Sequence, residues 1–143
     1  MIHLLDVNVL IALLDADHVF HDRAHRWFAD NADAGWATCP MTQNALVRIL
    51  GHNRYSKGPG SPAAVAELLR PWLARRDHLF WPDDLSLLAS DHIETAALSA
   101  SDQVTDTYLL ALSVHHRGRL ATFDRRISTA AVVGGAEALA VIA

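Results

Sequence analysis

The sequence predicts a three-layer α/β fold, with a central, mostly parallel sheet of about five short strands covered by helices on both faces. Two observations support this fold class. Short apolar runs rich in Leu, Val and Ile recur without polar alternation, as in strands buried on both faces. Longer stretches with the 3.6-residue period of amphipathic helices separate those runs. A length of 143 residues suits one hydrophobic core, so we expect a single domain over residues 1–143.

The N-terminal segment predicts a strand, a polar turn and two helices. Ile2–Leu5 is a short apolar run typical of a buried strand. Asp6 and Asn8 interrupt the apolar sequence before a helical run over Val9–Leu14. Apolar residues then recur with helical spacing over Phe20–Asp30, so we expect an amphipathic helix there. A carboxylate and an amide within an apolar run are unfavourable unless something pairs with them, which makes the polar turn a candidate site.

The middle of the chain predicts a strand, two helices and a loop between the helices. Ser61 and Pro62 form a good N-cap and first helical residue for the second of these helices. Pro71 should kink or shorten that helix, because it lacks a backbone N–H. The other expected elements here are a strand at Trp36–Thr38, a helix from Pro40 to its end at Gly51, and a mobile loop over His52–Ser61.

The C-terminal half continues the alternation of strands and helices. Pro82 stops a strand, and Gly118 is a natural left-handed residue after a helix. The expected strands are Leu79–Trp81, Leu120–Phe123 and an edge strand at Leu139–Ile142, and the expected helices are Leu85–Ile93 and Gln103–His116.

Composition narrows the function classes. Sixteen acidic and twelve basic residues give a net charge of -4, so no global positive field holds a polyanion, and any nucleic-acid contact must be local or carried by bound cations. Cys39 is the only cysteine, which excludes an intrachain disulfide and favours a reducing, cytoplasmic location. The apolar run Val9–Leu14 is short and lacks a preceding basic segment, so we expect neither a signal peptide nor a membrane span.

Four aspartates are expected to meet at one edge of the sheet. Asp6 follows the first strand and Asp124 follows the fourth, and the carboxyl ends of parallel strands share one crevice. Asp106 lies in the first turns of the helix before the fourth strand, with Asp102 one turn earlier. Converging carboxylates repel each other unless a cation lies among them. Mg²⁺ or Mn²⁺ suits such oxygen ligands, and metal-assisted hydrolysis of a nucleic acid is the chemistry this predicts.

Five segments carry a family resemblance. LLDVNVLIAL, HDRAHRWF, LFWPDD, VTDTYLLALS and LATFDRR, in this order over nearly the whole chain, resemble PIN-domain ribonucleases of the VapC toxin type. The resemblance implies a PIN-like fold and endonucleolytic RNA cleavage that depends on Mg²⁺ or Mn²⁺. It also implies a homodimer and a role as the toxin of a type II toxin–antitoxin pair, which inhibits translation and growth and is neutralised by a VapB-like antitoxin.

The same resemblance assigns roles to individual residues. Asp6 corresponds to the first metal carboxylate and Asn8 to its polar companion, while Asp106 matches the acid of the helix motif and Asp124 the acid after the fourth strand. The family usually has a glutamate on the third helix, which this chain lacks. That ligand is therefore replaced by the amide of Gln43 or Asn44, supplied by Asp102, or missing.

Other polar residues are candidates for the same crevice. Thr42, Gln43, Asn44 and Arg48 either line it or lie on the outer face of the third helix, and the planar fork of Arg48 suits a phosphate. Thr122 either holds a ligand carboxylate or the attacking water, or is a buried strand threonine.

Asp6 and several other polar residues also have a purely structural interpretation. Asp6 is also a good cap for the helix after the first strand. His21 and His25 share a helix side, but no third zinc ligand is evident, and a solvated face is the better interpretation. His115 and His116 suit the negative end of a helix dipole. In the loop, the basic residues around Tyr55 could follow an RNA backbone while the ring stacks on a base, or they could be merely solvated.

Two other functions are alternatives to a nuclease. Phosphatases and receiver domains need a lysine at a strand end, whereas the only lysine here is Lys57, in the loop. A non-catalytic PIN-like domain that binds RNA or a protein partner is the stronger alternative, because the third-helix glutamate is absent. Aromatic side chains such as Phe20, Trp27 and Trp72 could form a dimer or antitoxin surface, or simply pack in the core.

Overall fold

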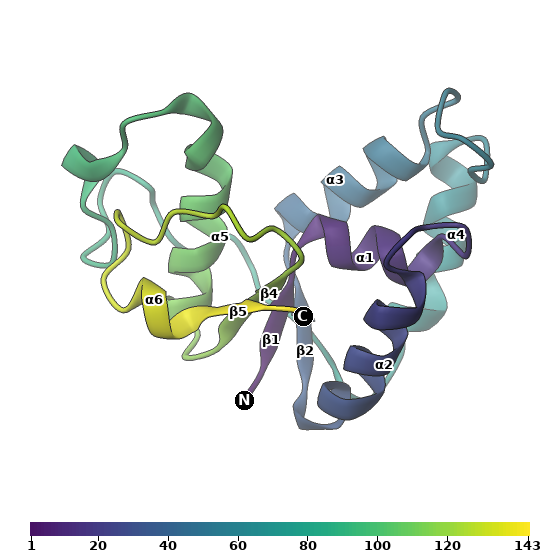
Figure 1. Ribbon diagram of the computed structural model, residues 1–143, viewed down its shortest axis with the longest axis horizontal. Coiled ribbons are helices and arrows are strands. Elements are labelled where there is room, and N and C mark those ends of the chain that lie inside the picture. Colours follow the sequence, from purple (N-terminus) through teal and green to yellow (C-terminus); the bar gives the residue numbers. More distant parts are fainter.

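The computed structural model describes all residues, Met1–Ala143, and confirms the predicted α/β fold (Figure 1). Its five strands form one sheet in the order β3-β2-β1-β4-β5, and every neighbouring pair is parallel. In register, Leu4 of the first strand lies between Ala37 and Leu120 of its two neighbours. The strands are β1 (His3–Leu5), β2 (Trp36–Thr38), β3 (His78–Phe80), β4 (Arg119–Thr122) and β5 (Leu139–Val141).

Helices cover both faces of this sheet. One core lies between the sheet and the first four helices, and the other lies between the sheet and the last two (Figure 1). No helix combines the length and the apolar character needed to cross a lipid bilayer. The helices are α1 (Val7–Leu14), α2 (His21–Asn31), α3 (Pro40–Leu50), α4 (Pro62–Leu73), α5 (Val104–His115) and α6 (Gly135–Ala138), with 3₁₀ turns at Ala32–Ala34, Thr95–Ala97 and Ser101–Gln103.

Local sequence explains where α4 begins, and Pro71 lies near its end. The Ser61 hydroxyl accepts a hydrogen bond from the Ala64 N–H at 3.2 Å, as expected of an N-cap, and Pro62 is the first helical residue. Pro71 lies inside the helix, which continues to Leu73. The helix therefore ends within one turn after the residue that cannot donate a backbone hydrogen bond.

The helix expected over Leu85–Ile93 is absent, and turns replace it. The Ser86 hydroxyl accepts hydrogen bonds from the N–H groups of Leu88 and Ala89, both at 3.2 Å. Serine side chains that satisfy nearby backbone donors compete with helix formation, which explains why the apolar spacing misled the prediction. Ile93 instead forms an isolated antiparallel bridge with Val132.

The end of α5 also differs from expectation. The left-handed residue is Arg117, with a φ of 59°, and not Gly118. Gly118 is required for a different reason: a Cβ there would lie 2.5 Å from the Ile2 carbonyl oxygen and 2.6 Å from the Trp81 ring. The glycine lets the chain pass closely between the start of β1 and a buried tryptophan as it enters β4.

The order of the strands positions the site. From β1 the sheet is built outward through β2 and β3 on one side and through β4 and β5 on the other. In open α/β sheets, the ligand crevice lies beyond the carboxyl ends of the strands, at the point where the strand order changes direction. The turn after β1 and the segment after β4 are therefore neighbours, and both contain predicted site residues.

Candidate active site

Asp6 lies directly after β1 and is only 6 % exposed. One carboxylate oxygen accepts a hydrogen bond from the Val7 N–H at 2.8 Å, which caps α1, and the other accepts one from the Thr122 hydroxyl at 2.8 Å. Burial raises the pKa of Asp6, these hydrogen bonds partly oppose the rise, and the charge of Asp124 adds to it. The cap role and a place in the acidic crevice thus coexist in one side chain.

The Thr122 hydroxyl joins the carboxyl ends of β1 and β4. It donates to Asp6 and accepts hydrogen bonds from the Asn8 amide and the Asp124 N–H, each at 3.0 Å. The Asn8 side-chain oxygen in turn accepts a hydrogen bond from the Phe123 N–H at 3.1 Å. Thr122 and Asn8 therefore hold Asp6 and Asp124 in fixed relation to each other.

Asp106 brings a third carboxylate to the crevice from the first turn of α5. Its pKa is raised to about 6, first by burial and then by the charges of Asp6, Asp124 and Asp102. No hydrogen bond or ion pair with a protein group compensates its charge. The raised pKa of Asp106 therefore reflects both its burial and the charges of three nearby acidic groups.

Two hollows meet at Asp106. One has a volume of about 350 Å³ and the other about 570 Å³. The first is lined by Asp6 and by residues of α3, and the second by Asp102 and Asp124. Asp106 is the one residue that lines both hollows, so the acidic groups of the two meet at its carboxylate.

The structure separates the four candidates on α3. Asn44 and Arg48, one helical turn apart, line the first hollow beside Asp6. Thr42 also lines it, but its hydroxyl is bonded to the backbone of Cys39 and serves as the helix cap. The prediction of a site position for Gln43 is wrong: its amide donates to the Thr38 hydroxyl at 2.9 Å and lines neither hollow. Successive helical residues point about 100° apart, so Asn44 and Gln43 cannot share one direction.

Sequence reasoning missed Arg126. It lines the second hollow, and its backbone N–H donates to the Asp124 carboxylate at 2.8 Å. Its guanidinium lies 3.6 Å from the same carboxylate and is 92 % exposed, so this ion pair is weak and the cation remains available. The arginine pair in LATFDRR, directly after the acid, was the signal that could have identified it.

The basic loop lies elsewhere. The Tyr55 hydroxyl donates to the Asp15 carboxylate at 2.6 Å, and Asp15 caps the far end of α1 from Asp6. An eight-residue helix is about 12 Å long, so the expected stacking of Tyr55 on a base held in this crevice is not favoured. Lys57 pairs with Asp17 at the same end, which also leaves the acidic crevice without the lysine of a phosphatase.

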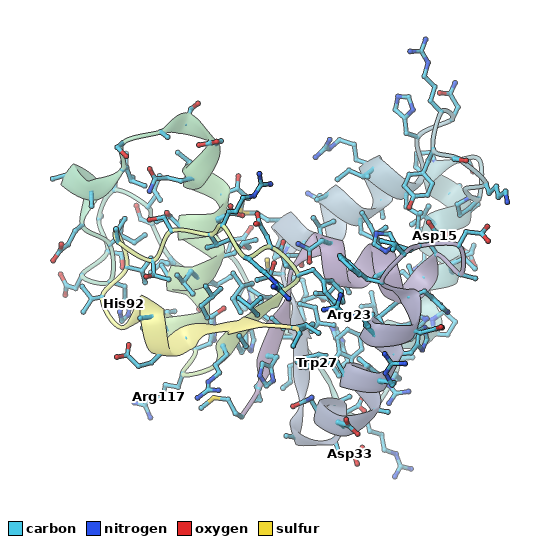
Figure 2. All side chains as sticks on the ribbon, in the orientation of Figure 1. Asp15, Arg23, Trp27, Asp33, His92 and Arg117 are labelled. Carbon is cyan, nitrogen blue, oxygen red and sulfur yellow. The ribbon has the colours of Figure 1, made fainter.

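Two further sets of candidates serve the packing of α1 and α2. His21 and His25 contact the carbonyl oxygens of Ala12 and Leu13 at 2.7 and 2.9 Å, at the end of α1, instead of lying on a solvated face. Trp27 lies between α2 and the sheet, as Figure 2 shows, whereas Asp33 points away from the body. Trp72 packs edge-on against Phe28, and Phe20 stacks on Phe123, so core packing accounts for the aromatic side chains of this region.

The donor set fits a hard divalent cation. Apart from the exposed Arg48 and Arg126, every charged group that lines the two hollows is a carboxylate, and neither Asp6 nor Asp106 has a basic partner. Mg²⁺ and Mn²⁺ prefer oxygen ligands and need only a few carboxylates. A cation here would relieve the repulsion that raises the pKa of Asp106.

Comparison with known proteins gives a consistent result. The family model described as "PIN domain" matches residues 3–133. Ribonuclease VapC44 of Mycobacterium tuberculosis is 48% identical over 131 residues, which cover 92% of each chain. Ribonuclease VapC39 of the same organism is 40% identical over 139 residues, covering 97% of this chain and 100% of the relative. Ribonuclease VapC29 is 45% identical over 121 residues, covering 85% and 84%.

Proposed function

Because this chain belongs to the PIN-domain family, we propose that it is a VapC-type endoribonuclease, the toxin of a type II toxin–antitoxin pair, whose acidic crevice uses a divalent metal ion. Residues 1–143 would act as one PIN-like unit. The observation that carries this proposal is Asp106, a half-buried carboxylate without a protein partner beside three other acids. An arrangement this unfavourable is expected to persist where a bound cation compensates it.

We assign the metal ligands to Asp6, Asp106 and Asp124, with Asp102 as the nearest further acid. A bound Mg²⁺ or Mn²⁺ would supply an activated water and stabilise the leaving oxygen of the phosphodiester. The protein groups have separate tasks. Thr122 and Asn8 keep two carboxylates in place through the hydrogen bonds described above, while Arg48 and Arg126 flank the acids and can bind the RNA phosphates on either side.

Cleavage of a mixed panel of single-stranded and structured RNA tests the proposal. The purified protein is expected to cut at least one RNA with Mg²⁺ or Mn²⁺ and none with chelator. Cleavage that continues unchanged in chelator would exclude a metal nuclease. If no RNA is cut although Mn²⁺ binds, the non-catalytic alternative gains support. The feature that favours this alternative is the lack of a glutamate on α3, where the amide of Asn44 lines the crevice beside Asp6.

Two substitutions test which residue acts as a metal ligand in place of the glutamate that the family usually has on α3. We expect Asp102→Asn to weaken Mn²⁺ binding severalfold, because Asp102 contributes charge at Asp106, and to leave part of the cleavage activity. Asn44→Ala serves as the comparison. Calorimetric titration with Mn²⁺ measures both variants, and a loss of affinity in Asn44→Ala alone would assign the role to the amide instead.

Arg48 is expected to bind substrate without taking part in the chemistry. Arg48→Gln should raise KM for RNA by roughly tenfold and reduce the slope of log affinity against log salt by about one, with kcat nearly unchanged. Arg76→Gln is the matched control, because Arg76 is an exposed arginine just before β3, at the amino ends of the strands. An unchanged KM and salt slope in Arg48→Gln would remove this residue from the RNA path.

Family membership also supports a VapB-like antitoxin as partner and a homodimer as the assembly. The aromatic side chains of α2 and α4 no longer argue for the dimer, since they pack within the chain. Light scattering over a range of concentrations tests it directly: a mass of 15.6 kDa that does not change with concentration would rule the homodimer out.

A further inference from the structure

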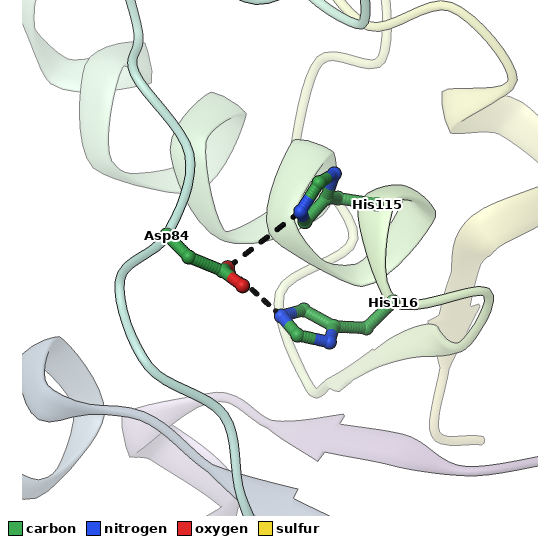
Figure 3. Close-up of side chains that lie close together, drawn as sticks. All are labelled: Asp84, His115 and His116. Atoms are coloured by element: carbon green, nitrogen blue, oxygen red, sulfur yellow. Dashed lines mark hydrogen bonds and ion pairs between the residues drawn. The ribbon is translucent and has the colours of Figure 1, made fainter.

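A second cluster of ligand-type side chains lies at the opposite end of α5 from the acidic crevice (Figure 3). His115 is the last residue of that helix and His116 is its C-cap, while Asp84 comes from the segment after β3. Asp106 precedes His115 by nine residues of α5, or about 14 Å along the helix axis. The cluster is therefore separate from the acidic crevice and shares no residue with it.

The three side chains converge on one point. The Nε2 atom of His116 lies 3.0 Å from the Asp84 Oδ1 atom, and Nε2 of His115 lies 3.7 Å from the same oxygen. All three ligand atoms are within 4.8 Å of one another. Ligands on a tetrahedral Zn²⁺, with bonds of about 2.0–2.1 Å, lie about 3.4 Å apart. The observed spacing needs only small side-chain movements to accept such an ion.

An ion pair with Asp84 explains the position of His116 but not that of His115. His116 forms a hydrogen bond with Asp84, but His115 points its Nε2 atom at the same oxygen from beyond hydrogen-bond distance and has no hydrogen-bond partner. A bound cation would use both imidazoles, because each would offer a lone pair to the ion.

Neighbouring rings hold the two imidazoles. The Trp81 ring stacks on His116, with centroids 4.6 Å apart and an interplanar angle of 12°. His92 packs edge-on against His115, with centroids 5.6 Å apart. The side chains of Asp84 and His115 remain 42 % and 37 % exposed, so an ion can reach the cluster from solvent. Oriented ligands with an open approach are what a metal site requires.

We propose that Asp84, His115 and His116 bind a borderline transition-metal ion, with Zn²⁺ the best match, and that water completes its coordination. Two imidazoles and one carboxylate suit Zn²⁺ far better than Mg²⁺, which prefers oxygen alone. The ion would tie the irregular segment after β3 to the end of α5. Its expected effect is stabilisation of this region, and it does not depend on ribonuclease activity.

Zn²⁺ titration in excess Mg²⁺ tests the site, because Mg²⁺ competes for carboxylate ligands but not for imidazole. We expect one Zn²⁺ per chain, a rise in Tm of about 5–10 °C at Zn²⁺ far above its Kd, and shifts of the imidazole nitrogen resonances of His115 and His116 alone. Both Asp84→Asn and His116→Gln should weaken Zn²⁺ binding by at least about tenfold.

His52→Gln is the matched control, since His52 is an exposed histidine in the loop after α3. Asp84→Asn keeps an acceptor for His116 and changes no buried contact, so it remains informative if His116→Gln folds poorly after losing its Trp81 contact. Asp84→Asn could bind Zn²⁺ as tightly as the control does, or Zn²⁺ could shift the imidazole nitrogen resonances of other histidines only. Either result would show that these residues form only an ion pair.

Discussion

Replacing Asp6 with asparagine is expected to reduce kcat for RNA cleavage by roughly a thousandfold while changing the free energy of unfolding by no more than about 1 kcal/mol. The carboxylate is lost as a metal ligand. The new amide has a single acceptor oxygen, whereas the carboxylate accepts from both the Val7 N–H and the Thr122 hydroxyl, so one hydrogen bond is lost. The loss of that hydrogen bond is offset by removal of a buried charge that has no basic partner.

RNA cleavage and urea unfolding of the same preparations measure the two effects. Asp33→Asn is the control, because Asp33 is an exposed aspartate in the 3₁₀ turn after α2 (Figure 2). A purely structural Asp6 would give the reverse pattern, with stability lost and activity kept. Activity of Asp6→Asn equal to that of Asp33→Asn would remove Asp6 from the chemistry.

In the metal-free protein, Asp106 is expected to lower the free energy of unfolding as pH rises from about 4 to 7, and Asp106→Asn removes this contribution. The pKa of Asp106 is raised from 3.8 to about 6 in the folded state. Its contribution to stability is therefore fully present below the unfolded pKa and is lost as pH rises through the folded one. Because Asp106 is only half-buried, solvent screening reduces the expected difference to about 1–2 kcal/mol.

Urea unfolding in chelator at a series of pH values measures this, with the wild type compared with Asp106→Asn. Adding Mn²⁺ at neutral pH should restore the stability of the wild type by mass action and do little for the variant. Burial of Asp6 raises its pKa in the same direction and remains in both proteins, so the comparison measures the effect of the Asp106 carboxylate, including its repulsion of Asp6. If the free energy of unfolding changes with pH by the same amount in both proteins, the proposal of a charged cluster around Asp106 is contradicted.

The convergence of Asp6 and Asp124 was predictable because it depends only on topology. Both follow buried parallel strands, and the carboxyl ends of such strands meet at one edge. The choice between Gln43 and Asn44 was not predictable. One residue along a helix rotates a side chain by about 100°, and only the packed position of α3 against α1 decides which amide faces the crevice.

The remaining differences come from side-chain hydrogen bonds and from irregular backbone. The Ser86 hydroxyl favours turns where apolar spacing indicated a helix. The path of the segment after β3 brings Asp84 to His115 and His116, and no periodic pattern encodes such a path. From the sequence alone, the helix dipole therefore explains the two histidines, and their contact with Asp84 is not predictable.

Crystals soaked in Mn²⁺ and measured at wavelengths sensitive to its anomalous scattering give the most direct test of the central claim. We expect an anomalous peak bonded to the carboxylates of Asp6, Asp106 and Asp124, where the two hollows meet. No peak in this crevice at saturating Mn²⁺, or a peak only at Asp84, His115 and His116, would contradict it.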